Sequence, residues 1–270
     1  MSLGERIKEK REQLGLTQEE VAKQLEISFQ AVSSWERDEY KPDTKNLIKL
    51  ADILNTSVSS LVEDKISFKT KKEIYDWKHM KTYVKTTAKH YKLSNTLKAL
   101  DYAMEAHKGQ SRKKSDVPYI YHPLNMACHI LALDIMDDEI IAATLLHDVI
   151  EDCGKSYEDL PVKDSIKKLV NDLTREEIPG ASRKEKLTKY YKKIKSNPKA
   201  CLIKCVDRCN NLTTMSWGLS RDRIYRTISE TEEYVLPLLK VLKNIPEYNN
   251  AYWLLNYQIE SMLDIYKRLL

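Results

Sequence analysis

Residues 139–152 read EIIAATLLHDVIED, and the rest of the chain is organised around this stretch. Its apolar residues give one helical face, and Asp137 or Asp138 can cap the helix in front of them. Helical spacing gathers the polar residues at its end into one sector about 140° wide: His147, Asp148, Glu151 and Asp152. The stretch therefore predicts a buried helix that ends in three carboxylates and an imidazole.

That polar helix end has two interpretations. So much like charge on a mostly apolar helix is costly when it is unpaired, and a bound cation relieves it. Imidazole and carboxylate ligands together suit manganese, iron, zinc or magnesium rather than a thiolate-type site. The alternative is a charged last turn that faces water, because an isolated His-Asp pair is not diagnostic of a metal site.

The composition of the chain is that of a helical protein. Its 270 residues include only 6 Gly and 8 Pro, between long periodic runs rich in Leu, Ile, Lys and Glu, and 42% are hydrophobic. This allows one large or two ordinary domains with real cores. No apolar run approaches the roughly 18 residues of a membrane span, and the first 15 residues are too charged for a signal peptide. We expect an all-α protein with no membrane partner.

The 5 cysteines are odd in number and lack the paired spacing of a disulfide framework. Reduced thiols in a cytoplasm are the expectation that follows. Cys201, Cys205 and Cys209 repeat every four residues, so they share one stripe of a helix. Small buried residues explain that stripe better than a metal cluster does.

The net charge of +5 is unevenly distributed along the chain. Residues 1–65 hold 10 Lys and Arg against 13 Asp and Glu, whereas residues 66–120 hold 13 against 5. Residues 121–270 are neutral. Any attraction for nucleic acid phosphates that rests on net charge must therefore come from the middle of the chain.

Residues 1–65 carry the signals of a domain of five short helices. Thr17 followed by Glu20 is a capping box ahead of an apolar run, and Ser28 can cap the next helix. Gly15 suits the position just after the first helix. Two short helices joined by so tight a turn form a helix-turn-helix.

The segment TQEEVAKQLEISFQAVSSWERDEYKPD, residues 17–43, resembles the helix-turn-helix of the XRE/Cro-type repressor family, with the resemblance covering roughly residues 3–63. It implies a homodimer on double-stranded DNA, with the second helix in the major groove. By position, Gln18 would meet a phosphate, and four residues would face the bases: Phe29, Gln30, Ser33 and Ser34. Glu26 stands where the family has Gly, and together with the acidic balance this predicts weak non-specific binding. A bundle kept only for dimerisation is the alternative.

Residues 66–94 read as a basic helical linker in which lysines alternate with aromatic residues. The spacing permits an amphipathic helix that joins the domains and packs its aromatic face on one of them. Its lysines could supply the phosphate contacts that the first domain lacks. A solvated lysine face is the other interpretation.

Two further clusters lie in the second predicted domain, residues 95–270. The first is RKKSDVPYIYHP, residues 112–123, in which Pro123 is well placed to begin a helix. The second is KCVDRCNN, residues 204–211, where Asp207 and Asn211 are four residues apart and share a helix face.

These two clusters, together with the segments LLHDVIED and SETEEYVLPL, occur in the same order as in a known family. Over roughly residues 95–240 the chain resembles the HD-superfamily hydrolase domain of RelA/SpoT proteins and small alarmone hydrolases. The resemblance implies removal of pyrophosphate from the 3′ position of a phosphorylated guanosine nucleotide, typically with one Mn²⁺ ion. The metal ligands it implies are His122, His147, Asp148 and Asp207. It assigns Glu151, Asp152 and Asn211 to catalysis, and the nucleotide contacts to Arg112, Lys113, Lys204, Arg208 and Tyr234.

Two other functions remain open at this point. In one, the protein is a transcriptional regulator whose HD domain senses a nucleotide without turning it over. In the other, both domains are interaction modules. The intact ligands and the intact Glu151–Asp152 pair favour hydrolysis, because a pure sensor has no need of groups that activate water. Departures from the family pattern, such as Cys153 after the acidic pair, remove no implied ligand.

Overall fold

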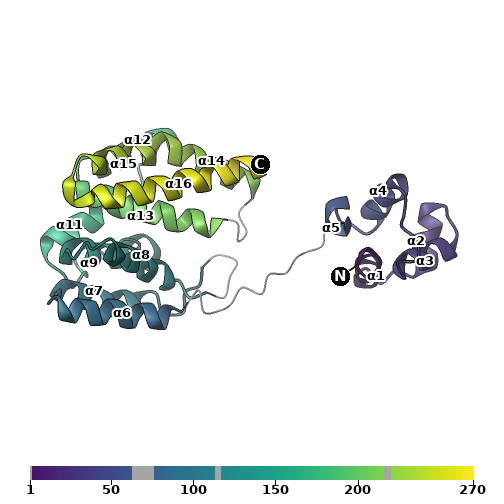
Figure 1. Ribbon diagram of the computed structural model, residues 1–270, viewed down its shortest axis with the longest axis horizontal. Coiled ribbons are helices and arrows are strands. Elements are labelled where there is room, and N and C mark those ends of the chain that lie inside the picture. Colours follow the sequence, from purple (N-terminus) through teal and green to yellow (C-terminus); the bar gives the residue numbers. More distant parts are fainter. Residues whose placement is uncertain (1, 63–75, 113–116, 216–219) are drawn as a thin grey trace. The chain divides into compact units, whose positions relative to one another are not determined.

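The computed structural model describes residues 2–62, 76–112, 117–215 and 220–270, which form helices joined by turns and loops (Figure 1). The chain divides into two compact units, residues 1–71 and 72–270. The described residues contain helices and no named strand, which confirms the all-α class. Within the same ranges, no helix has the length and apolar character needed to cross a membrane.

The first unit consists of five helices, as predicted: α1 (Leu3–Gln13), α2 (Gln18–Leu25), α3 (Phe29–Glu36), α4 (Thr44–Ile53) and α5 (Val58–Val62). Apolar side chains from all five helices meet in one core that includes Ile7, Val32 and Leu50. The capping box predicted before α2 is present, since the side chain of Thr17 accepts from the Glu20 N–H and the Glu20 carboxylate accepts from the Thr17 N–H. This reciprocal pair defines where α2 begins.

The turn between α2 and α3 depends on Glu26. This residue ends α2 in the left-handed conformation, with φ 61°, a region in which a side chain is disfavoured and glycine is not. The replacement of the family's glycine by Glu26 therefore leaves the turn geometry in place and adds local strain. A buried ion pair lies behind α3, where Arg11 binds both carboxylate oxygens of Glu36 at 2.6 and 3.0 Å.

The second unit begins its described part with α6 (Trp77–His90), α7 (Ser94–Ala106), α8 (Tyr121–Ala132) and α9 (Asp138–Leu146). The short α10 (Val149–Cys153) leads to α11 (Asp164–Leu173), α12 (Arg183–Lys195) and α13 (Pro198–Thr213). The chain ends with α14 (Arg221–Glu230), a π-helical turn at Thr231–Val235, α15 (Leu236–Lys243), a 3-10 turn at Pro246–Tyr248 and α16 (Asn249–Leu269).

Helix α13 is the central element of this unit. It packs against α8, α11, α12, α15 and α16, and most of its side chains are buried, including all three of its cysteines. These cysteines are free thiols that fill the core. Because α13 is enclosed on so many sides, any polar residue on it needs a partner inside the protein.

Helix α6 packs against α7 and α8, with Val84 and Ala88 in the core of the second unit. The described part of the segment predicted as a linker is thus a packed helix and turn of this unit. The lysines at positions 69, 71 and 72 lie outside the described residues. Whether the linker boundaries are 66 and 94 stays a prediction.

The central stretch departs from one continuous helix. Asp137 caps α9, as predicted, by accepting from the backbone N–H groups of Glu139 and Ile140, but the helix ends at Leu146. His147 and Asp148 form a turn before α10 begins at Val149. The prediction of one continuous helix was therefore wrong, although His147, Asp148, Glu151 and Asp152 still line one cavity.

Candidate metal centre and adjoining cleft

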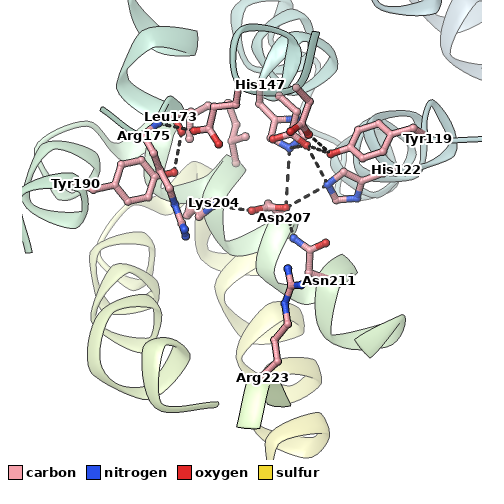
Figure 2. A pocket seen from close by; sticks show the side chains of 14 residues that line it. Tyr119, His122, His147, Leu173, Arg175, Tyr190, Lys204, Asp207, Asn211 and Arg223 are labelled. Atoms are coloured by element: carbon pink, nitrogen blue, oxygen red, sulfur yellow. Dashed lines mark hydrogen bonds and ion pairs between the residues drawn. The ribbon is translucent and has the colours of Figure 1, made fainter. Parts of the chain in front are cut away.

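Two imidazoles and a carboxylate converge at the centre of the second unit (Figure 2). His122 comes from the first turn of α8, His147 from the turn after α9, and Asp207 from the middle of α13. Their ligand atoms all lie within 4.8 Å of one another, and all three residues are buried. Oδ1 of Asp207 is 3.2 Å from Nε2 of His122 and 3.9 Å from Nε2 of His147.

The outer nitrogen of each imidazole is already engaged. Nδ1 of His122 lies 2.5 Å from Oδ1 of Asn210, and Nδ1 of His147 lies 2.8 Å from the carbonyl oxygen of Thr144. Donation from Nδ1 leaves the Nε2 lone pair pointing inward, as in metal-binding histidines. Nε2 of His147 is buried and makes no hydrogen bond among the described residues. Carboxylate oxygens of Asp148 and Asp207 lie 3.0 and 3.9 Å from it, so a cation among these groups would be bound by the nitrogen as well.

Asp148 adds a second carboxylate beside the two imidazoles. Its Oδ2 lies 3.0 Å from Nε2 of His147 and 3.7 Å from Nε2 of His122. Burial disfavours a charged imidazole, but the carboxylates of Asp148 and Asp207 outweigh it and raise the pKa of His147 to about 9. The field at this point therefore attracts positive charge, which a divalent ion would supply.

Asp207 is held by donors on both sides of its carboxylate. Lys204 donates to Oδ2 at 2.7 Å, and Nδ2 of Asn211 donates to Oδ1 at 2.6 Å. Burial raises the pKa of Asp207, but Lys204 and the two imidazoles outweigh it and hold that pKa well below its usual range. Lys204, which was predicted as a nucleotide contact, thus forms an ion pair with Asp207. It also lines the cavity.

Tyr119 connects two of the acidic residues. Its hydroxyl lies 2.6 Å from Oδ2 of Asp148 and 2.8 Å from Oδ2 of Asp152. Burial and these two carboxylates raise the pKa of Tyr119, so the hydroxyl keeps its proton. The sequence places Tyr119 within the motif PYIYHP, and that motif is the signal by which its role could have been found.

Glu151 lies on α10 at the edge of the same cavity and accepts a hydrogen bond from the backbone N–H of Arg175. Burial raises the pKa of Glu151, and the nearby Asp148 carboxylate raises it further. The hydrogen bond from the Arg175 N–H lowers the pKa, but by less than these effects raise it. A carboxylate with a raised pKa is better suited to accept a proton.

A larger cleft adjoins the metal cavity. The cavity has a volume of about 290 Å³ and the cleft about 1100 Å³, and both are lined by Tyr119, Asp207 and Asn211. Arg112 reaches across it, donating to Oδ1 of Asn211 at 3.2 Å and to Oγ1 of Thr214 at 2.8 Å. The predicted partner of Arg112, Lys113, lies outside the described residues.

The other two predicted nucleotide contacts differ in position. Arg208 lines the cleft, but it is buried and pairs with Glu230 at 2.7 Å. Tyr234 lines neither the cavity nor the cleft. Its ring stacks on Tyr191, with centroids 4.9 Å apart. The sequence offered no sign of several residues that line the cavity or the cleft, because they come from segments far from the motifs along the chain: Arg175, Arg183, Tyr190, Arg223 and Arg226.

In the first unit, the predicted DNA contacts lie at the start of α2 and along α3. Phe29 and Gln30 are exposed at the start of α3, whereas Ser33 and Ser34 are half-buried. Ser34 donates to the carbonyl oxygen of Ala31 at 2.8 Å. The side chain of Gln18 also has an internal partner, because its Nε2 donates to Glu36 at 2.7 Å.

Comparison with known proteins agrees with this division. Residues 7–61 match a helix-turn-helix family model, and residues 99–232 match a model of the HD domain. The chain is 33% identical over 147 residues to a guanosine-3′,5′-bis(diphosphate) 3′-pyrophosphohydrolase of Aquifex aeolicus, covering 52% of this chain and 20% of that protein. It is 35% identical over 143 residues to the bifunctional (p)ppGpp synthase/hydrolase SpoT of Escherichia coli K12, covering 50% and 20%.

A probable GTP pyrophosphokinase of Mycobacterium leprae is 34% identical over 151 residues, covering 54% of this chain and 19% of its own length. The alignments thus span about a fifth of these relatives and about half of this chain. Two family models, placed on the two compact units, carry the assignment. The chain therefore joins a helix-turn-helix domain, residues 7–61, to an HD domain, residues 99–232.

Proposed function

We propose that the HD domain is a metal-dependent hydrolase that removes pyrophosphate from the 3′ position of a guanosine nucleotide, the reaction that the names of two of its relatives describe. One observation carries the proposal. Two imidazoles and two carboxylates face a common point in a buried cavity, with two further carboxylates on its wall and a basic cleft next to it.

One divalent ion would be held by His122, His147, Asp148 and Asp207. The orphaned Nε2 of His147 and the mixed nitrogen and oxygen donors fit such an ion, and we propose Mn²⁺. When bound, the ion lowers the pKa of a water molecule and neutralises a phosphate oxygen. Asn210 and Thr144 fix the two imidazoles, and Lys204 keeps Asp207 in its charged form.

Glu151 and Asp152 would take the proton of the attacking water. Water adds to the phosphorus nearest the ribose, the bond from this phosphorus to the 3′ oxygen breaks, and the products are a 3′-hydroxyl nucleotide and pyrophosphate. The raised pKa of Glu151 suits proton acceptance near neutral pH. Tyr119 orients Asp152 through its hydroxyl, and Asn211 is placed between the metal ligand Asp207 and Arg112.

The nucleotide would lie in the cleft and contact Arg112. Lys113, the next residue in the sequence, stays a predicted contact, and the buried Arg208 would act through its positive charge. A substrate with four or five phosphate groups explains why an acidic metal cavity opens into a basic cleft. Tyr234 would contribute through its stack on Tyr191 rather than by direct contact.

The first unit would bind double-stranded DNA as a homodimer, inside the cytoplasm where DNA and guanosine nucleotides are both present. Phe29 and Gln30 are exposed at the start of α3, where a recognition helix contacts bases. Ser33 and Ser34 would lie along the same face, and Gln18 would meet a phosphate. Gln30 would read adenine, since a glutamine amide can pair with N6 and N7.

The test uses purified full-length protein with Mn²⁺ and a panel of guanosine nucleotides, with ³¹P NMR of the products. Pyrophosphate release from the 3′ position is expected. Glu151→Gln should lower the rate by roughly 10²–10⁴ while the metal stays bound. Asp207→Ala should lose the metal by elemental analysis, and the exposed Asp164→Ala should keep it.

Nucleotide binding without any turnover by the wild-type protein would contradict hydrolysis and favour the sensor alternative. Native-rate turnover by Glu151→Gln would contradict the role of that carboxylate. Unchanged metal content in Asp207→Ala would contradict the ligand assignment.

A further inference from the structure

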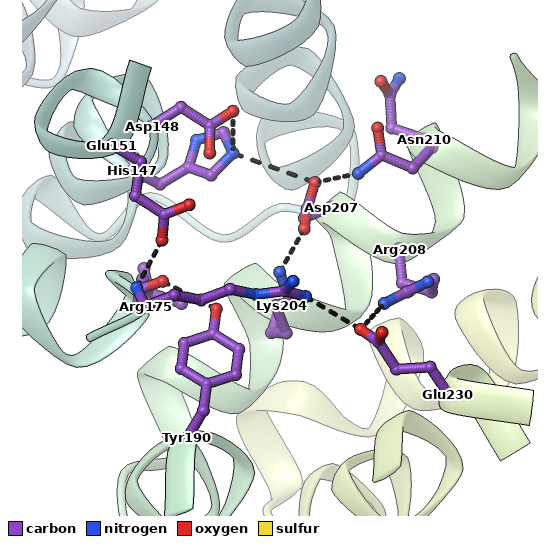
Figure 3. A network of polar contacts seen from close by, with 12 residues as sticks. His147, Asp148, Glu151, Arg175, Tyr190, Lys204, Asp207, Arg208, Asn210 and Glu230 are labelled. Atoms are coloured by element: carbon purple, nitrogen blue, oxygen red, sulfur yellow. Dashed lines mark hydrogen bonds and ion pairs between the residues drawn. The ribbon is translucent and has the colours of Figure 1, made fainter. Parts of the chain in front are cut away.

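One wall of the cleft is built around a single buried carboxylate. Glu230, the last residue of α14, accepts from Arg208 at 2.7 Å and from Arg175 at 2.9 Å (Figure 3). Arg183 donates to its other carboxylate oxygen at 3.2 Å. The hydroxyl of Tyr191 is a further donor at 2.9 Å. Burial raises the pKa of Glu230, but Arg208 and Arg175 outweigh it and lower that pKa to about 2. Three guanidinium groups thus share one negative charge, so positive charge is left in excess.

Two more arginines extend this wall along α14. Arg223 and Arg226 are three residues apart, so they lie on neighbouring turns of one helix face. Both are exposed and line the cleft. Within the described ranges, neither guanidinium has an acidic or hydrogen-bonding partner. They differ in this respect from Arg175 and Arg183, whose guanidinium groups bind Glu230.

The charge of the cleft as a whole is positive. Its described lining includes seven basic side chains against four acidic ones. The buried Nε of Arg208 is an additional donor that has no partner in the part of the chain described. Buried donors without partners are rare and costly, and an anion nearby would offset that cost. The wall is therefore suited to bind a group with several negative oxygens.

Arg223 also lines the metal cavity, where Figure 2 shows it extending toward Asn211. The arginine wall and the metal centre are thus two ends of one continuous site. A cleft of about 1100 Å³ is large enough for a nucleotide. One ligand can therefore place a phosphate group at each end.

We propose that Arg223 and Arg226 form a second phosphate subsite, which binds the 5′ phosphates of a nucleotide whose 3′ group lies at the metal centre. This inference rests on the proposed function and narrows its substrate to nucleotides phosphorylated at both ends. Guanidinium groups suit the task because they donate two parallel hydrogen bonds to phosphate oxygens.

The experiment compares two substrates that differ only at the 5′ end. One is guanosine 3′-diphosphate 5′-diphosphate, and the other is guanosine 3′-diphosphate with a free 5′ hydroxyl. In full-length Arg223→Gln/Arg226→Gln, kcat/KM for the first should fall about 10- to 100-fold, mainly through KM, since two charge-assisted contacts are lost. For the second substrate, kcat/KM should change less than about 3-fold, because no 5′ phosphate is present to lose a contact.

Arg221→Gln is the matched control. Arg221 lies on the same helix and carries the same charge, but it contacts the carbonyl oxygen of Leu270 and does not line the cleft. This variant should treat both substrates as the wild type does. Equal losses on the two substrates in the double variant would overturn the subsite, because they would mean a structural effect or contact with the scissile group.

A binding measurement separates this proposal from the proposed function. If the wild type cleaves neither substrate, the hydrolase proposal fails, and calorimetry with guanosine 5′-diphosphate and guanosine then tests the subsite alone. The wild type should prefer the diphosphate, and the double variant should lose about 10-fold or more of that preference. An unchanged preference would overturn the subsite whatever the activity.

Discussion

Lys204 donates a 2.7 Å hydrogen bond to Oδ2 of Asp207, three residues further along α13. Both side chains are almost fully buried. The other oxygen of Asp207, Oδ1, accepts from Asn211 and faces the two imidazoles. The lysine therefore neutralises Oδ2, while Oδ1 lies where a cation between the imidazoles would meet it. The pair explains how a charged carboxylate can be buried on the central helix α13.

This pair gives the first prediction. Lys204→Met leaves Asp207 buried without its partner, so the metal-free protein should lose about 3–5 kcal/mol of stability. Mn²⁺ should recover part of this loss, because the ion neutralises the same carboxylate. Thermal unfolding with and without Mn²⁺ measures both effects. An equal loss of stability in the presence and absence of Mn²⁺ would show that Asp207 does not bind the ion.

Tyr119 gives a second prediction. Tyr119→Phe removes the hydroxyl shared by Asp148 and Asp152, but it keeps the ring that stacks on His107 with centroids 4.7 Å apart. Loss of such an orienting contact should weaken metal affinity or turnover by about 10- to 100-fold. Metal titration and steady-state rates measure the two effects. Wild-type metal affinity and wild-type turnover in Tyr119→Phe would show that the hydroxyl does not orient the acidic residues.

The strained turn of the first unit gives a third prediction. Glu26→Gly should stabilise the helix-turn-helix domain by about 0.5–1 kcal/mol, because glycine adopts φ 61° without the steric cost of a side chain. The gain is partly offset by the greater freedom of glycine in the unfolded chain. Denaturant unfolding measures it. Glu26→Ala keeps a Cβ and should gain nothing.

Gln30 gives the fourth prediction. On DNA selected for binding, Gln30→Ala should lose about 1–3 kcal/mol of preference for adenine at one position of each half-site. Affinity for unrelated DNA should stay the same, since phosphate contacts set that affinity. Competition assays with each base at that position provide the measurement. Gln24→Ala, exposed on α2, is the control. A preference unchanged in Gln30→Ala would exclude this residue as the base reader.

The helices, and the order of the two domains, could be predicted from the sequence because their causes are local. Capping residues lie within three positions of the N–H groups they bind, as Thr17 and Asp137 do, and apolar periodicity marks each buried face. The proposed metal ligands also lie inside short recognisable motifs. The break after Leu146 was missed, because the helical pattern of the sequence runs through His147 and Asp148, which form a turn between two helices in the structure.

The chain by itself thus determined two all-α domains and the residues able to hold a metal ion. Only the tertiary structure decided that Lys204 pairs with Asp207, that Tyr119 connects Asp148 to Asp152, and that the arginines of α12 and α14 form one wall of the cleft. In the sequence, the residues that make these contacts cannot be told from charged residues on a solvent-exposed helix. Their partners are selected by how α13 is enclosed, because a buried charge must find its counterpart among whichever helices pack around it.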